Sequence, residues 1–326
     1  MSEPAAAAAD GSSMVTPGSH PHVSVVIPAY NVQAHLAQCL VSVSSQARDF
    51  EIEVIVVDDG SADATVEIAR RTAGVRCITQ PNRGPSAARN LGIAAARGKY
   101  IAFLDADDLW PLGKLQAQIR LLQQHPELAL VFGDCRQFDA NGQRPRTEFQ
   151  ANRLGAAAWG PGPAIPDAYA LLLEVNFITT GSVIVRRDVL QQVGGFAVDL
   201  RLVEDLDLWL RIARLHPIGW CEQECLLRRR HTDNISRDTD AMGFAYLEVL
   251  RRHRQSWTAQ EATAMRLDAG PLASRKYLFL AELAVSQGKP SAALRRVWRS
   301  VAASPRPQTL WRITKSAIKF VLGRHA

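Results

Sequence analysis

The strongest constraint on this chain is a pattern that occurs four times in its first 124 residues, a short apolar run followed by an amphipathic stretch. The apolar runs are residues 23–27, 54–57, 75–78 and 100–104, and the amphipathic stretches are residues 33–46, 62–72, 85–97 and 112–124. Continuous apolar runs are typical of strands that are buried on both faces. The alternation therefore predicts an α/β fold, with helices on both faces of a mostly parallel sheet.

Polar clusters follow these strands, at the ends where α/β sheets bind their ligands. The clusters are Pro28-Ala29-Tyr30-Asn31, Asp58-Asp59-Gly60-Ser61, Arg83-Gly84-Pro85-Ser86-Ala87-Ala88-Arg89-Asn90 and Asp105-Ala106-Asp107-Asp108. The first three also have ordinary interpretations as a turn, a helix cap and an exposed helix. The fourth is harder to explain structurally, because three carboxylates within four residues repel one another unless a cation is present. Alternate residues can direct two of them at one hard metal ion.

The length of 326 residues suggests about two folding units. Residues 1–21 lack apolar periodicity and predict a flexible tail, residues 22–238 the α/β domain, and residues 239–326 a helical extension. Within the domain we expect strands at 128–138 and 182–185, a turn at Asn141-Gly142, an irregular loop at 143–167 that orders over substrate, and a helix at 204–215. In the extension we expect helices at 242–253, 259–267, 271–287 and 291–303.

Charge suggests an anionic partner. Lys and Arg number 38 against 32 Asp and Glu, and many of the basic residues follow Leu227. Phosphates or an acidic membrane surface fit this excess, as does a merely basic surface. Residues 310–322 predict a basic amphipathic helix that either lies on an anionic membrane or packs on its own domain. We expect no nucleic-acid partner.

The five cysteines are odd in number and lack CxxC spacing, so they are interpreted as reduced, buried thiols. No apolar run is long enough to cross a bilayer, and no secretory pattern opens the chain. We therefore expect a cytoplasmic protein, with peripheral contact to the inner face of the plasma membrane through the basic C-terminus as an open alternative.

Taken together and in this order, the four clusters resemble the family 2 glycosyltransferases of the GT-A fold. Two later features add to the resemblance. Gly194-Gly195-Phe196 precedes Glu204-Asp205 and Trp209, and Arg229-Arg230-His231 precedes Asn234 and Ser236. The resemblance spans residues 23–236 and leaves the helical end uncovered.

The resemblance implies a nucleotide-sugar donor and an inverting transfer. The segment Pro28-Ala29-Tyr30-Asn31, with Asp59 and Arg89, would hold the base and ribose. Asp105-Ala106-Asp107 would be the DXD motif, in which Asp107 touches a divalent metal, Mn²⁺ or Mg²⁺, and Asp105 acts through the ribose or a metal-bound water. The metal would neutralise the charge that grows on a departing nucleoside diphosphate.

On the acceptor side, the resemblance assigns Asp205 as the base that takes the proton of the attacking hydroxyl, with Glu204 as the runner-up. Both acids also fit ordinary placement at a helix N-terminus. Arg229 and His231 would lie near the diphosphate. Trp209 packs in a core more often than it stacks on a sugar, and an exposed indole beside Asp205 would do the latter.

By family frequency we expect UDP as the nucleotide, and a glycan or lipid-linked acceptor in bacterial surface polysaccharide synthesis. Pyrophosphorylase, dehydrogenase and P-loop functions are disfavoured, because no glycine-rich phosphate loop follows the first strand. The remaining alternative is a non-catalytic scaffold that binds a nucleotide and recruits partners through its helical end.

Overall fold

The computed structural model describes residues 22–46, 50–231 and 239–258, together with residues 274, 277, 278, 280, 281 and 290–303. The predicted tail at 1–21, the motif residues Asn234 and Ser236, and the predicted helices at 259–267 and 310–322 lie outside the described residues. So does most of the predicted helix at 271–287.

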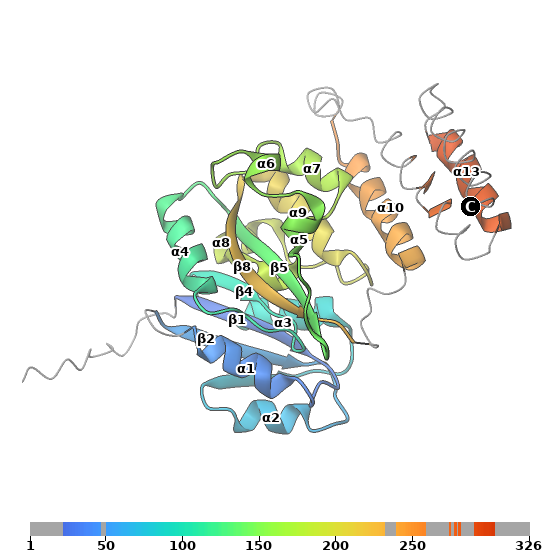
Figure 1. The fold of residues 1–326 in the computed structure, drawn as a ribbon. Helices are drawn as coiled ribbons and strands as arrows, with labels where there is room; N and C mark the ends of the chain where they lie inside the picture. The colour runs from blue at the N-terminus through green and yellow to red at the C-terminus, as the bar shows by residue number, and fades with distance from the viewer. Residues whose placement is uncertain are drawn as a thin grey trace, which may run out of the picture.

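A single eight-stranded sheet organises the described part of the chain, with the order β3-β2-β1-β4-β7-β5-β6 and with β8 paired to β5 (Figure 1). The strands are β1 (Val23–Ala29), β2 (Ile52–Asp58), β3 (Val75–Thr79), β4 (Tyr100–Phe103), β5 (Leu130–Asp139), β6 (Gly142–Gln143), β7 (Ile184–Arg186) and β8 (Ile218–Arg229). Strands β3, β2, β1 and β4 are parallel, as are β5 and β8. Strand β7 runs antiparallel to β4 and β5, and β6 runs antiparallel to β5. The predicted mostly parallel sheet is confirmed.

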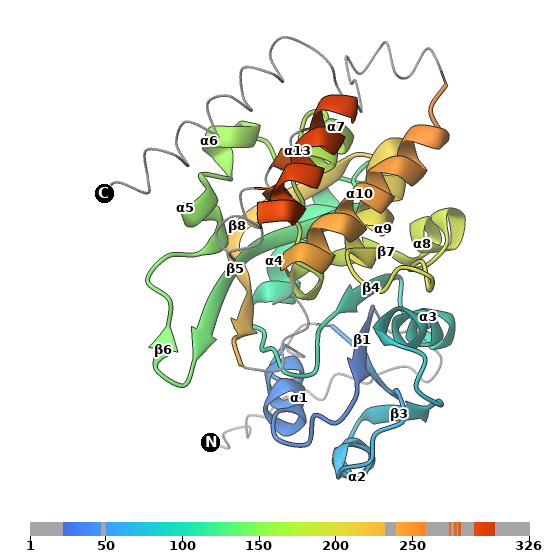
Figure 2. The ribbon, with the colours of Figure 1, turned by 90° about the vertical axis from the view of Figure 1, so that its right-hand side faces the viewer.

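Helices cover both faces of this sheet. The helices are α1 (Leu36–Ser44), α2 (Thr65–Arg71), α3 (Pro85–Ala95), α4 (Lys114–Gln124), α5 (Glu148–Asn152), α6 (Ala156–Trp159), α7 (Ala168–Glu174), α8 (Arg187–Val193), α9 (Glu204–Leu215), α10 (Thr239–Gln255) and α13 (Pro290–Ala303), with a 3-10 turn, η1 (Thr180–Ser182). Helices α1, α2 and α4 share one apolar cluster, and α3 shares the other with α7 to α10. Figure 2 shows α1 and α3 on opposite sides of β1.

The segment 143–167 is not an irregular loop, so that prediction was wrong. Helix α5 begins with a capping box, in which the Thr147 hydroxyl accepts from the Gln150 amide and the Gln150 side chain accepts from the Thr147 amide. Phe149 and Trp159 are buried and pack edge to face with each other. Both rings also pack against Phe132 of β5. Apolar burial against the sheet orders this segment.

Helix α10 belongs to the same core as the sheet, because Val249 and Leu250 are buried in the cluster that contains α7 and α9. The Tyr246 hydroxyl donates to the carbonyls of Leu172 and Leu173 at the end of α7, at 3.0 Å each. Helix α13 lies beside α10 (Figure 2), and the Arg296 guanidinium donates to both oxygens of Asp240. In the described segments, no helix has the length and apolarity to span a bilayer.

Candidate active site

The site forms where the parallel strands end. Register places Ala29 of β1 beside Asp58 of β2, and the Asp59 amide donates to the Ala29 carbonyl at 2.8 Å. The Leu104 amide continues the ladder from β4 to Val26 at 3.2 Å. Because these strands end at neighbouring positions, the loops that follow β1, β2 and β4 form one rim.

The loop after β1 is tied to the loop after β2. Asn31 has φ +48°, a left-handed conformation that asparagine tolerates. Its amide donates to the Ser61 hydroxyl at 2.9 Å, and its side-chain oxygen accepts from the Ala62 amide at 2.8 Å. Tyr30 is 52% exposed beside this contact. Asn31 therefore orders the rim, and Tyr30 is left as an accessible aromatic face.

Asp59 fixes the loop before α3. Its Oδ1 accepts from the Gln80 side chain at 2.7 Å and from the Arg83 amide at 2.8 Å, and its Oδ2 accepts from the Gly84 amide at 2.8 Å. The side chain is buried. Both carboxylate oxygens thus hold backbone in place, and the ribose contact assigned to Asp59 by resemblance stays a prediction.

Arg89 joins the two acidic parts of the site. Its guanidinium donates to Asp105 Oδ1 at 2.7 Å and to Glu204 Oε1 at 2.9 Å, although Glu204 lies 115 residues further along the chain. The Arg89 side chain is only 7% exposed, against 39% for Asp105. Burial opposes the charge of Arg89, but attraction to Asp105 and then to Glu204 raises its pKa above the ordinary value. Arg89 stays charged and holds the carboxylates together.

The acidic loop after β4 is held by the end of β8. The Arg229 amide donates to Asp108 Oδ1 at 2.7 Å, and the Arg229 side chain donates to the Asp107 carbonyl at 2.8 Å. His231 Nε2 lies 2.8 Å from Asp107 Oδ2, with both side chains partly exposed. Burial, followed by repulsion from Asp107 and Asp105, raises the pKa of Asp108 well above its usual range. Asp107 and His231 are therefore brought together at the rim, while Asp108 is a buried anchor.

Asp205 lies in the first turn of α9, next to Glu204. Its Oδ1 accepts from the Asn176 side chain and its Oδ2 from the Thr180 hydroxyl, at 3.3 Å each. Burial raises the pKa of Asp205 despite these hydrogen bonds. Burial and then the neighbouring Asp205 raise the pKa of Glu204 as well. A carboxylate with a raised pKa is a stronger base than a solvated one.

The backbone before α9 is strained. Val203 has φ +61°, which is costly for a β-branched residue, about 1–3 kcal/mol. Val203 is buried, so packing holds it in this conformation. The strained residue comes directly before Glu204 and Asp205, and its conformation sets the direction in which α9 starts.

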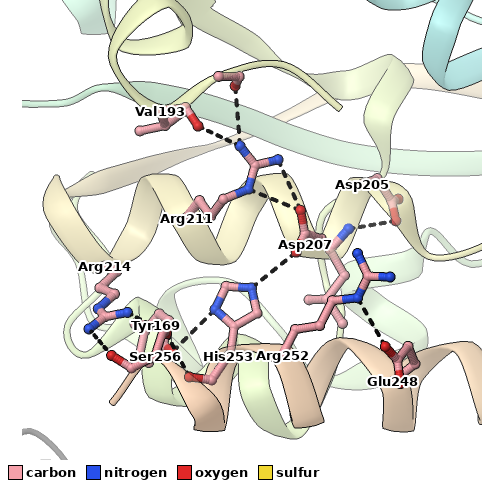
Figure 3. Close-up of polar contacts among 12 residues, drawn as sticks. Tyr169, Val193, Asp205, Asp207, Arg211, Arg214, Glu248, Arg252, His253 and Ser256 are labelled. Carbon is pink, nitrogen blue, oxygen red and sulfur yellow. Dashed lines mark hydrogen bonds and ion pairs between the residues drawn. The ribbon is translucent and has the colours of Figure 1, made fainter. Parts of the chain in front are cut away.

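Two clamps hold the Gly194-Gly195-Phe196 turn that precedes this helix. The Asn90 side chain accepts from the Phe196 amide and donates to the Phe196 carbonyl, at 2.8 Å each. A Cβ on Gly195 would lie 2.1 Å from the Asn90 side-chain oxygen, so only glycine fits there. Arg211 of α9 donates to the Val193 carbonyl at 2.7 Å (Figure 3). It also donates to the Gly195 carbonyl at 2.6 Å.

Residues 24–194, just over half of the chain, match the model of the family described as Glycosyl transferase family 2. The chain belongs to this family. An uncharacterized glycosyltransferase of Haemophilus influenzae is 32% identical over 174 residues, which cover 52% of the chain and 63% of that relative. The O-antigen biosynthesis protein RfbC of Myxococcus xanthus is 33% identical over 219 residues, 65% of the chain and 16% of RfbC. The chain spans less than two thirds of the length of these curated relatives.

Solved structures show the same GT-A fold. Residues 1–349 of TarS from S. aureus, in complex with UDP-GlcNAc, superpose with a TM-score of 0.57 at 16% identity, covering 87% of this chain and 92% of that one. The mannosyltransferase PcManGT of Pyrobaculum calidifontis, in complex with GDP-Man and Mn²⁺, gives a TM-score of 0.60 at 19% identity, covering 93% and 81%.

In this family 2 chain, the matched region contains the donor-side residues that the sequence singled out and ends before Asp205, Arg229 and His231. Folding brings the later residues to the same rim, through the contacts of Arg89 with Glu204 and of Asp107 with His231. Ala106 is buried within the acidic loop, and Pro28 and Ala29 lie inside β1. Trp209 is fully buried and packs against Phe103 and Phe196. Its indole is not exposed to a sugar.

Sequence reasoning missed two residues of the site, Asn176 and Thr180. They lie in the segment between α7 and β7, which has neither strand nor helix periodicity. No motif marks them, because their importance comes from a partner, Asp205, that only the fold supplies.

Proposed function

We propose that this chain is an inverting glycosyltransferase that moves a sugar from a nucleoside-diphosphate donor to an acceptor hydroxyl. The observation that carries the proposal is one connected set of contacts. Arg89 bonds both to Asp105 on the donor side and to Glu204 beside the hydrogen-bonded carboxylate of Asp205. A donor and an acceptor bound at these two positions would meet on one rim.

Asp205 is the proposed base. Its ionised carboxylate takes the proton of the acceptor hydroxyl while the hydroxyl oxygen forms a bond to the anomeric carbon. The bond from that carbon to the diphosphate breaks on the opposite face, so the configuration inverts. Asn176 and Thr180 hold the two Asp205 oxygens, which orients the carboxylate before the acceptor arrives. Glu204, committed to Arg89, serves as a positioning residue for this arrangement.

Tyr30 is the exposed aromatic group at the rim and is proposed to stack on the nucleotide base. Asn31 and Asp59 hold the loops on either side, through their bonds to the Ala62 and Gly84 amides. Asp105 is partly exposed beside Arg89 and is proposed to meet the ribose. UDP is the proposed nucleotide, since TarS was solved with UDP-GlcNAc, although PcManGT was solved with GDP-Man.

Asp107 and His231 are the residues that would hold a divalent cation, Mn²⁺ or Mg²⁺, at this rim. Their facing atoms are 2.8 Å apart and both side chains are partly exposed. Across the described ranges, no three His, Cys, Asp or Glu side chains gather as a dedicated metal cage. The single carboxylate of Asp107 fits a cation shared with substrate phosphates, which is how Mg²⁺ is commonly bound. When bound, the cation would neutralise charge on the departing diphosphate.

The acceptor is proposed to be a glycan or a lipid-linked glycan of bacterial surface polysaccharide synthesis. The support is the relative RfbC, which is named for O-antigen biosynthesis. A cytoplasmic location, with the basic C-terminal end on the inner face of the plasma membrane, completes the proposal. The competing scaffold function would need no base, and the raised pKa of Asp205 favours the enzyme.

The test is a screen of UDP- and GDP-sugars for thermal stabilisation of the full chain, with Mn²⁺, with Mg²⁺ and with EDTA. A donor at 100 times its Kd adds about 2.7 kcal/mol of stability. We expect metal-dependent stabilisation by at least one sugar nucleotide and turnover of the labelled donor. Asp107→Asn should lose the metal-dependent part. The matched control Asp188→Asn, an exposed acid of α8, should retain it. Stabilisation without turnover would support the scaffold, and no response to any donor would exclude both.

A further inference from the structure

Two cysteines meet at a bulge in β8, away from the acidic rim. The pairing of β8 with β5 shifts register there, from Gly133 opposite Cys221 to Asp134 opposite Glu224. The extra residues form a short bulge between Cys221 and Cys225, and the two Sγ atoms lie 3.5 Å apart. The sequence predicted five reduced, buried thiols. The structure instead brings two of them into contact, and Cys221 is partly exposed.

The fold makes room for this contact. A Cβ on residue 133 would lie 2.3 Å from the Cys225 sulfur and 2.8 Å from the Gln223 carbonyl, so the position needs glycine. Gly133 therefore allows Cys225 to pack over β5 and reach Cys221. The two thiols also differ in their surroundings, since Cys225 is fully buried and Cys221 is not.

Helix α4, which packs against β8, carries a buried lysine whose charge interacts with the pair. Lys114 of α4 is 0% exposed, its ammonium donates to the Val183 carbonyl at 3.3 Å, and it lies 4.0 Å from the centre of the Trp110 ring. Burial lowers the pKa of Lys114 to about 7, and attraction to Cys225 and Cys221 opposes this shift. The hydrogen bond from Cys225 and then the charge of Lys114 lower the pKa of Cys221, against burial and the charge of Asp134. Burial raises the pKa of Cys225.

We propose that Cys221 and Cys225 form a modification site that reacts with hydroperoxides, with Cys221 as the attacking thiolate and Cys225 as the resolving thiol. This inference is independent of the transfer reaction. Disulfides are rare in reducing compartments, and those that form there are usually transient and catalytic or redox-sensing.

The reaction balances in two steps. The Cys221 thiolate attacks an oxygen of the hydroperoxide, the O–O bond breaks, and water or an alcohol leaves after gaining one proton, so that Cys221 becomes a sulfenic acid. The Cys225 sulfur then attacks the Cys221 sulfur, an S–S bond forms, and hydroxide leaves as water with the Cys225 proton. The two thiols lose two electrons, and the hydroperoxide gains them. Bond formation closes the 3.5 Å gap to about 2.05 Å.

The test treats the intact chain with limiting hydrogen peroxide, alkylates free thiols and maps peptides by mass spectrometry. We expect a peptide with a Cys221–Cys225 disulfide that dithiothreitol reverses. Cys77 is the internal control, since it is also partly exposed but burial raises its pKa. Cys221 should react faster than Cys77 by about tenfold.

Two variants assign the roles. Cys225→Ser should accumulate a Cys221 sulfenic acid that dimedone traps, and Cys221→Ser should yield no trapped product at Cys225. Equal oxidation of Cys77 and Cys221 in the wild-type chain would overturn the proposal. So would the absence of the Cys221–Cys225 disulfide, and this result does not depend on whether either variant folds.

Discussion

Two regions on either side of the first turn of α9 differ in how far their polar side chains are exposed to solvent. At the rim, the loops after β1, β2 and β4 leave polar groups accessible, with Tyr30 52% exposed and the Asp105 side chain 39% exposed. At the junction of α9 with α10, the Asp207 and His253 side chains are only 9% and 5% exposed. The side chains that would contact substrate are exposed to solvent, whereas the side chains that hold α9 and α10 together are buried.

Helix α9 contributes to both regions through residues two positions apart. Side chains at i and i+2 point to different sides of a helix, so Asp205 and Asp207 cannot share a partner. Asp207 accepts from Arg211 at 3.0 Å and lies 3.3 Å from His253 Nε2 of α10 (Figure 3). Asp205 faces Asn176 and Thr180 instead.

The two aspartates also have opposite pKa shifts. Burial raises the pKa of Asp205, whereas at Asp207 the bonds to His253 and Arg211 outweigh burial and lower the pKa. Helix α10 thus holds Asp207, while the segment before β7 holds the carboxylate of Asp205, the proposed base.

Asp205→Asn should have the largest effect, because it removes the proposed base but keeps the side-chain shape. We expect kcat/KM to fall by about 10²–10⁴-fold, with little change in urea unfolding. Asp207→Asn is the matched control on the same helix, and it should lose stability but retain the rate per folded molecule. Equal rates for Asp205→Asn and the wild-type chain would remove Asp205 from the mechanism.

Arg89→Met should lower both transfer activity and stability, because Arg89 joins Asp105 to Glu204 within the site. Removing one partner of a buried ion pair costs about 3–5 kcal/mol in the free energy of unfolding. Arg71→Met removes an exposed arginine paired with the exposed Glu67 and should cost at most about 1 kcal/mol. Urea denaturation of both variants makes the comparison, and similar losses would mean that the Arg89 bridge is not structurally important.

The sequence was sufficient for the first half of the fold. Strands β1 to β4 lie within two residues of the predicted runs, because strands buried on both faces are continuously apolar. Strand β8 was missed, since the polar residues Glu222, Gln223 and Glu224 at the bulge break its apolar run. Helix α5 was also missed, although Thr147 and Gln150 have the spacing of a capping box.

The sequence predicts the site residues that directly follow strands. It does not predict the residues whose role depends on a partner far away in the sequence. Asp105 and Asp107 follow a strong strand, so their position was visible in the sequence. Nothing in the sequence predicts the left-handed backbone of Val203, because tertiary packing imposes a conformation that valine itself disfavours.

His253→Ala tests the junction of α9 with α10 and should lower the free energy of unfolding by less than Arg89→Met. The variant leaves a buried oxygen of Asp207 without a partner from α10, at a cost of about 1–3 kcal/mol. The folded-state pKa of Asp207 is depressed, so its contribution is present above the unfolded value and is lost as the pH falls through the folded value. Without the bond from His253 the Asp207 pKa should rise, and acid unfolding should begin at higher pH. An unchanged acid transition would show that His253 does not support Asp207.

Thr180→Val should give the smallest change, confined to the pH dependence of transfer. The Thr180 hydroxyl donates to Asp205 Oδ2 and favours its ionised form, against the burial that raises the pKa. Valine is nearly isosteric and removes only this bond, so the pKa of Asp205 should rise further. Because the base must be ionised, the acid limb of kcat/KM should move to higher pH, while the plateau rate changes little. Thr179→Val, at the adjacent threonine, should leave the limb in place. A shift in both variants would trace the effect to the backbone of this segment, and a shift in neither would mean that the acid limb reports a group other than Asp205.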